Sequence, residues 1–297
     1  MGPMYLAFEG QILLEGCAPD GDSLRFLPRD PHALRALSNA ALLSRSRHGD
    51  GSVQLRLEGI DAPELHYEGA AQPRGARARD ALLDWLGVDV RALTFAFDEA
   101  TVLRAPRMAP LRVTALAREV DRHGRPIAYL LPGTGHTRAR RCHVTEVVLR
   151  RSANAAMLAA GEAYLLAYTS LPLAHRAVLR ALARGARRAR HGVWADDASA
   201  RGVALHGGKR ALGPGGALVF PKLFRRCIDY LLRRRAEGFG GSFVDWLAHY
   251  GAQGAARAPE RVSLTHAANI PFATLVHERD GRVVLDADLT ELVFAGA

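Results

Sequence analysis

The sequence has little lysine, little cysteine and no long apolar run. Lys209 and Lys222 are its only lysines, so arginine carries almost all of the positive charge. The three cysteines are odd in number, lie far apart and lack Cys-x-x-Cys spacing, so we expect reduced residues without a disulfide or metal role. No apolar run reaches the roughly 18 residues of a membrane span, and the N-terminus lacks the pattern of a secretion signal. We therefore expect a soluble, cytoplasmic protein that does not contact a membrane.

Histidine is plentiful, but its spacing does not suggest zinc. None of the 12 histidines forms His-x-x-x-His or His-Glu-x-x-His, and none joins the cysteines in a workable cluster. The formal net charge of +10 favours an anionic partner such as nucleic acid, although the same charge would also serve solubility. The planar fork of arginine suits phosphate oxygens, so the charge pattern is compatible with phosphate chemistry without requiring it.

Residues 1–194 have the texture of one α+β domain. Short β-favouring runs flank Asp20-Gly-Asp, and Val53 to Gly59 alternates apolar and polar residues, which predicts a half-buried strand. Two polar excursions, about 29–52 and 99–115, interrupt the pattern, and the first contains a short helical run, His32 to Leu43. The other elements predicted are helices at 75–86, 145–160 and 173–190 and strands at 93–97, 111–118 and 126–131.

The remainder divides into a glycine-rich stretch and a second globular unit. Residues 195–216 contain six glycines and little apolar periodicity, as expected of a flexible linker. Residues 217–297 predict a small α+β domain of unknown function. Its expected elements are helices at 221–235 and 242–249 and a hairpin around Asp280-Gly281.

Three short stretches carry the chemistry only when they are taken together. They are Asp20-Gly-Asp22, Arg56 followed by Asp61-Ala-Pro-Glu64, and His123-Gly-Arg125. Each alone is most often a turn, a strand end or a hairpin tip. Their joint order resembles the thermonuclease (staphylococcal nuclease) family. Two further features support that resemblance: the stretch from Asn154 to Gly161, and the Gly192-Val-Trp194 ending. The resemblance covers roughly residues 9–194.

The resemblance implies a five-stranded OB-fold β-barrel with three helices and a calcium-dependent nuclease. It implies that Asp22, Asp61 and the Ala62 carbonyl hold Ca²⁺, for which hard oxygen ligands are suited. Arg56 and Arg125 would clamp the scissile phosphate, and Glu64 would orient or deprotonate the attacking water. Asp20 would shape the turn or support the metal ligands. The implied substrate is single-stranded or loosely paired DNA or RNA.

The nucleotide-stacking surface departs from the family pattern. Ala167 and Thr169 stand where the family places aromatic side chains. Tyr168 or Tyr164 would have to substitute, yet an offset of one residue turns a side chain to another face.

Two other interpretations of function stay open at this stage. In one, the barrel grips nucleic acid or a peptide without cutting, as a binding module. In the other, the C-terminal domain is a platform for a protein partner that delivers the nuclease. The retained carboxylates favour catalysis over the first, and no motif in residues 217–297 supports the second.

Overall fold

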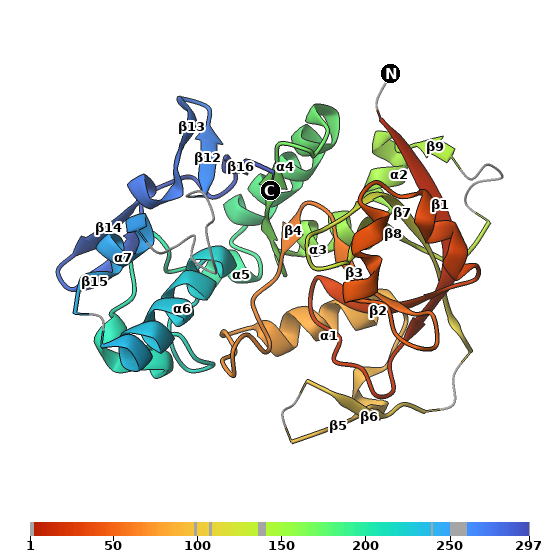
Figure 1. Ribbon diagram of the computed structural model, residues 1–297, viewed down its shortest axis with the longest axis horizontal. Helices are drawn as coiled ribbons and strands as arrows, with labels where there is room; N and C mark the ends of the chain where they lie inside the picture. The colour runs from red at the N-terminus through yellow and green to blue at the C-terminus, as the bar shows by residue number, and fades with distance from the viewer. Residues whose placement is uncertain are drawn as a thin grey trace.

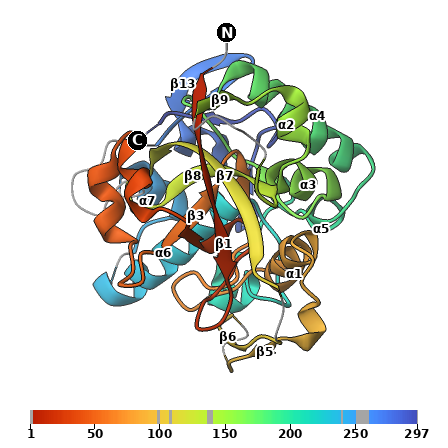
Figure 2. The same ribbon diagram turned by 90° about the vertical axis from the view of Figure 1, so that its right-hand side faces the viewer.

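A computed structural model describes residues 3–97, 100–106, 109–135, 141–238, 240–249 and 260–296. Its first half is a closed five-stranded β-barrel, seen on the right of Figure 1 and from its own side in Figure 2. The strands lie in the order β2, β3, β8, β7 and β1, and β1 pairs with β2 to close the ring, while β9 extends the sheet beside β1. Their bounds are β1 Met4–Leu13, β2 Ser23–Pro28, β3 Val53–Leu57, β7 Leu111–Val120, β8 Pro126–Pro132 and β9 Arg141–His143.

Alternation of side chains closes the barrel and points polar groups away from its core. In β3, Val53, Leu55 and Leu57 are buried, and Arg56 projects from the opposite side, as the sequence predicts. β3 pairs antiparallel with β2, so that Ser23 lies opposite Arg56, and pairs parallel with β8. This register brings the end of the Asp20 to Asp22 turn beside Arg56.

Helices cover one side of the barrel, as Figure 2 shows. They are α1 Gly75–Trp85, α2 Glu146–Arg150, α3 Ala153–Ala160, α4 Leu173–Arg188 and the short α5 Val193–Asp196. The structure confirms the predicted helices near 75–86 and 173–190, but it divides the 145–160 helix in two. Ser152 accepts a hydrogen bond from the amide of Ala155 and so begins a new helix, as serine N-caps do.

The first polar excursion forms two short 3-10 helices instead of the single helical run predicted for 32–43. They are η1 Pro31–Ala36 and η2 Ala40–Arg45. Asn39 between them has a φ of 59°, a left-handed conformation that ends one turn and starts the next. The second excursion contains β6 Val102–Arg104, which pairs with β5 Thr94–Phe95 next to η3 Val90–Ala92. Residues 99 and 107–108 of this excursion lie outside the described residues.

Residues of the Asn154 to Trp194 stretch tie the helices to the barrel. The buried Asn154 amide donates to the backbone carbonyls of Glu58 and Ala128, at 2.8 and 3.0 Å, and accepts from the amide of Leu130. Gly161 and Gly192 touch where α3 and α4 end. A Cβ on Gly192 would stand 2.0 Å from the Gly161 carbonyl oxygen, so the contact requires glycine.

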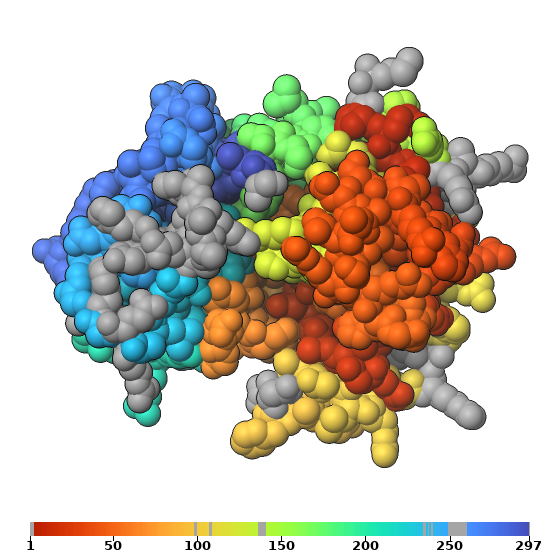
Figure 3. Space-filling model, viewed as in Figure 1, coloured from red at the N-terminus to blue at the C-terminus, as the bar shows by residue number. Residues whose placement is uncertain are grey.

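The C-terminal part lies against the barrel half in Figures 1 and 3. Its elements are α6 Pro221–Glu237, α7 Phe243–His249, β12 Arg261–Leu264, β13 Ala267–Pro271, η5 Phe272–Leu275, β14 Val276–Arg279, β15 Arg282–Leu285 and β16 Val293–Phe294. The two helices agree with the prediction, and the β14–β15 hairpin turns at Asp280-Gly281, where both residues have positive φ. Each of the described helices is too short or too polar to cross a membrane.

A shared sheet joins the two parts of the chain. β11 Ala167–Tyr168, from the nuclease-like half, pairs in parallel with β16, which lies next to β12 and β13. Arg184 and Arg187 of α4 form ion pairs with Glu291 and Asp288. One core of buried side chains extends through both parts.

The glycine-rich stretch 195–216 is folded onto its neighbours, in contrast to the flexible linker predicted from its composition. It contains the 3-10 helix η4 Leu205–Ala211, and Val203, Leu205 and Leu212 are buried. Gly202 and Gly208 adopt positive φ, so these glycines form turns that let the apolar side chains reach the core. The division into separate domains at this stretch stays a prediction.

A buried carboxylate beside the barrel makes stability depend on pH. Burial raises the pKa of Glu58 from 4.5 to about 7, against the opposing pull of Arg118, while Tyr5 donates a hydrogen bond to its carboxylate. The folded state therefore binds this proton more tightly than the unfolded state. The contribution is present below about pH 4.5 and is lost as the pH rises through about 7.

Relative to Glu58→Gln, the wild type should lose about 3 kcal/mol of unfolding free energy between these two pH values. Urea denaturation of both proteins from pH 4.5 to 8 measures this difference. Parallel pH profiles for the two proteins would contradict the assignment to Glu58.

Candidate active site

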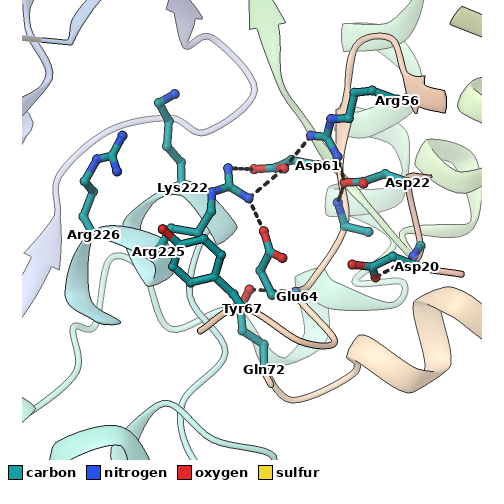
Figure 4. A network of polar contacts seen from close by, with 12 residues as sticks. Asp20, Asp22, Arg56, Asp61, Glu64, Tyr67, Gln72, Lys222, Arg225 and Arg226 are labelled. Carbon is teal, nitrogen blue, oxygen red and sulfur yellow. Dashed lines mark hydrogen bonds and ion pairs between the residues drawn. The ribbon is translucent and has the colours of Figure 1, made fainter. Parts of the chain in front are cut away.

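The candidate site lies where the β2 turn, β3 and the chain after β4 Ile60–Asp61 meet. β4 pairs with β10 Tyr164–Leu165, which fixes Asp61 beside the end of β3. Gly21 allows the turn before β2 to approach this segment, because a Cβ there would stand 2.6 Å from the Cβ of Ala62 and 2.7 Å from that of Ala78. The local folding of three segments thus converges on a few polar side chains (Figure 4).

Arg56 joins the carboxylates of Asp22 and Asp61. Its guanidinium forms an ion pair with Asp22 and donates to Oδ1 of Asp61 at 2.7 Å and to the Ile60 carbonyl at 3.0 Å. The Ala62 amide donates to Oδ2 of Asp22 at 2.9 Å. Asp61 is fully buried, so its charge depends on these partners.

A second guanidinium enters the site from α6 in the C-terminal part. Arg225 donates to both oxygens of Asp61, from Nη1 to Oδ1 at 3.2 Å and from Nη2 to Oδ2 at 2.8 Å, and it also contacts Oε1 of Glu64. Figure 4 shows Arg225 pointing from the helix toward these two carboxylates. Arg56 and Arg225 therefore share the same carboxylate oxygen.

The loop after Glu64 is attached to the C-terminal part as well. Gln72 accepts from the Glu64 amide at 3.1 Å and donates to the Val219 carbonyl at 2.7 Å, just before α6 begins. Tyr67 donates to Asp229 of α6 at 2.9 Å. The position of Glu64 therefore depends on residues from both parts of the chain.

Burial and charge act in opposite directions on the site's carboxylates. Burial alone would raise the pKa of Asp61, but Arg225 and Arg56 outweigh it and hold that pKa below its usual range. Burial raises the pKa of Glu64, although Arg225 opposes the shift. For Asp20, burial and the nearby charges of Asp22 and Glu64 raise the pKa well above its usual range. The Asp20 side of the site is therefore short of positive charge.

The chemistry of the donors fits a hard divalent cation, but the side chains are turned toward arginine. Asp20, Asp22, Asp61 and Glu64 supply only carboxylate oxygens. The Asp20 carboxylate accepts from the Gly21 amide at 2.7 Å and has no cationic partner among the described residues. Within the same residues, no group of three or more acidic, histidine or cysteine side chains is arranged to hold a metal ion. The oxygens of Asp22 and Asp61 bind guanidinium groups and a backbone amide instead.

The other predicted site residues lie at different depths. Arg125 is at the tip of the β7–β8 hairpin, where its ion pair is with Asp121 at 2.8 Å. The ring of Tyr164 is fully buried against Trp194 and Phe220, which leaves it no face for a nucleotide base, so its predicted substrate contact does not fit this structure. Tyr168 is only partly buried and lies under the ammonium group of Lys222.

Comparison with known proteins agrees with this arrangement. Residues 54–196 match the model of the family described as staphylococcal nuclease homologue. This part of the chain belongs to that family. The match includes Arg56, Asp61, Ala62, Glu64 and Arg125, and the barrel adds Asp20 and Asp22 from the preceding residues. No curated protein matches the chain.

Arg225 is the site residue that sequence motifs miss. It lies far beyond the family match, in a helix whose aromatic residues and basic charges predict a packing helix. The one available signal is that Lys222, Arg225 and Arg226 recur at helical spacing on one face, which indicates a basic surface but not where it points.

Proposed function

We propose that the protein is a calcium-dependent phosphodiesterase that hydrolyses single-stranded or loosely paired DNA or RNA. The observation that supports this proposal is the convergence of Asp22, Arg56, Asp61 and Glu64 from three segments of a nuclease-family barrel. Hydrolysis of a phosphodiester needs positive charge at the phosphate and a group that takes a proton from water. The cluster contains side chains for both tasks.

In this proposal each side chain has a separate task. Asp22, Asp61 and the Ala62 carbonyl would hold the divalent ion, which would supply charge at the phosphate oxygens. Arg56 binds the scissile phosphate through its fork of N–H groups, and Arg125 does so from the hairpin. Glu64 orients the attacking water and accepts its proton, while the Gln72 hydrogen bond to the Glu64 backbone keeps that segment in place.

Purified protein should cleave end-labelled single-stranded DNA and RNA in the presence of Ca²⁺ and leave 3′-phosphate ends. Addition of EDTA should abolish cleavage, because the carboxylate cluster would lose the cation that balances its charge. Denaturing gels over a time course, with and without Ca²⁺, measure both effects. Intact substrate with Ca²⁺ and with other divalent ions would refute the catalytic proposal.

A nucleic-acid-binding module that does not cut is the second candidate. The engagement of Asp22, Asp61 and Glu64 by arginines favours it, since these oxygens would have to leave their partners before they could hold a cation. Fluorescence anisotropy with a labelled oligonucleotide separates the two candidates. Submicromolar binding together with an intact substrate would support the module and exclude the enzyme.

A further inference from the structure

Arg225 has a different set of partners from the cations next to it on α6. Lys222 and Arg226 both form ion pairs with Glu260, and Arg226 also pairs with Asp229. These partners belong to the C-terminal part itself. The ion pairs of Arg225 are with Asp61 and Glu64, more than 150 residues earlier in the sequence. The C-terminal part therefore contributes one guanidinium to the cluster of the barrel half.

The helix holds Arg225 firmly in this position. α6 begins at Pro221, which suits the first turn of a helix, and Phe224, Cys227 and Ile228 are fully buried beside it. The Gln72 to Val219 and Tyr67 to Asp229 hydrogen bonds attach the site's loop to the start and middle of the same helix. A guanidinium supported in this way loses little further freedom when it binds an anion, which is the condition for an effective phosphate contact.

The two arginines already form a two-sided receptor for an oxyanion. Arg56 and Arg225 approach Oδ1 of Asp61 from different segments, at 2.7 and 3.2 Å. Both are nearly buried, with side-chain exposures of 15% and 20%, so water screens their charges little. A phosphodiester oxygen offers the same acceptor chemistry as the carboxylate that they now bind.

We propose that Arg225 is a catalytic residue that binds the scissile phosphate opposite Arg56, so that the active site is completed by the C-terminal part of the chain. This inference rests on the proposed phosphodiesterase function. Arg225 leaves Asp61 and Glu64 when substrate binds and donates to the phosphate oxygens, whose charge grows as water adds. The withdrawal of Arg225 also frees Glu64 to accept the proton of that water.

The test compares Arg225→Ala, Arg225→Gln and Arg225→Lys with the control Arg226→Gln. The control removes a neighbouring, similarly buried arginine whose ion pairs are with Glu260 and Asp229. Initial rates on labelled single-stranded DNA should show kcat reduced by about 10²-fold in the alanine and glutamine variants. KM should change little, and the lysine variant should lie in between because it keeps the charge but not the fork. The control should stay within about threefold of the wild type.

Binding provides a second measurement that does not need turnover. Titration of a nucleoside 3′,5′-bisphosphate should give about tenfold weaker affinity for Arg225→Gln than for wild type or Arg226→Gln. Thermal unfolding of each variant checks the fold, and Arg225→Lys carries the comparison if the alanine variant is unstable. Unchanged affinity and unchanged kcat in Arg225→Gln would overturn the proposal.

An increase in kcat in Arg225→Gln would also overturn it, because the guanidinium would then be blocking the carboxylates instead of binding substrate. Failure of the proposed function gives a different result. In that case the wild type itself does not cleave, and the bisphosphate titration still tests Arg225.

Discussion

Replacement of Arg56 by alanine should reduce the cleavage of single-stranded DNA by about 10³-fold, the largest effect we expect on activity. Arg56 neutralises Asp22 and Asp61 and, in the proposed mechanism, the phosphate as well. Its loss should appear mainly in kcat, since the charge on the phosphate oxygens is greatest in the transition state. Steady-state kinetics over a range of DNA concentrations measure this.

The structure also requires a check on folding for this variant. Arg56 compensates a fully buried Asp61, so its removal leaves a carboxylate that only Arg225 and the local backbone still hold. Arg56→Lys keeps a cation there and should fold like the wild type, yet remain strongly impaired because it lacks the fork. Arg150→Ala is the matched control, because it removes an arginine from an exposed pair with Glu146. Full activity in Arg56→Lys would contradict the role of the fork.

The largest expected effect on stability belongs to Asn154. Asn154→Ala should lower the free energy of unfolding by about 4 kcal/mol, because it leaves the Leu130 amide and the Glu58 and Ala128 carbonyls without their buried partner. Urea denaturation monitored by circular dichroism measures the change. Ser152→Ala, which removes the N-cap of the same helix, is the control and should cost about 1 kcal/mol. Equal losses in the two variants would show that Asn154 acts only through its helix.

The barrel and its cluster could be predicted because their residues are close in sequence or tied by strict local geometry. The alternation of β3 fixes the direction of Arg56, and the motif order places Asp22, Asp61 and Glu64 around it. Gly161 and Gly192 stand out in the sequence for a reason that the structure explains, since no side chain fits between them. The helix break at Ser152 could have been anticipated from its capping side chain.

Other features depend on tertiary contacts that no local pattern records. Six glycines predict a mobile stretch at 195–216, yet Val203, Leu205 and Leu212 find buried positions there. Tyr164 suits base stacking by sequence, but Trp194 and Phe220 enclose it. The distance in sequence between Asp61 and Arg225 explains why the basic residues of 221–235 could not be assigned to the site: their direction is set by how α6 packs, and the sequence does not specify that packing.

The parallel pairing of β11 with β16 sets an order on biosynthesis. Chains emerge from the ribosome N-terminus first, and the barrel strands β1 to β8 are all available before residue 140. Tyr168, however, has no strand partner until Phe294 has been made, and the helix with Arg225 is delivered only after three quarters of the chain. A nascent or prematurely terminated chain can therefore form the barrel but lacks the composite site, so assembly of the site becomes a late event in translation.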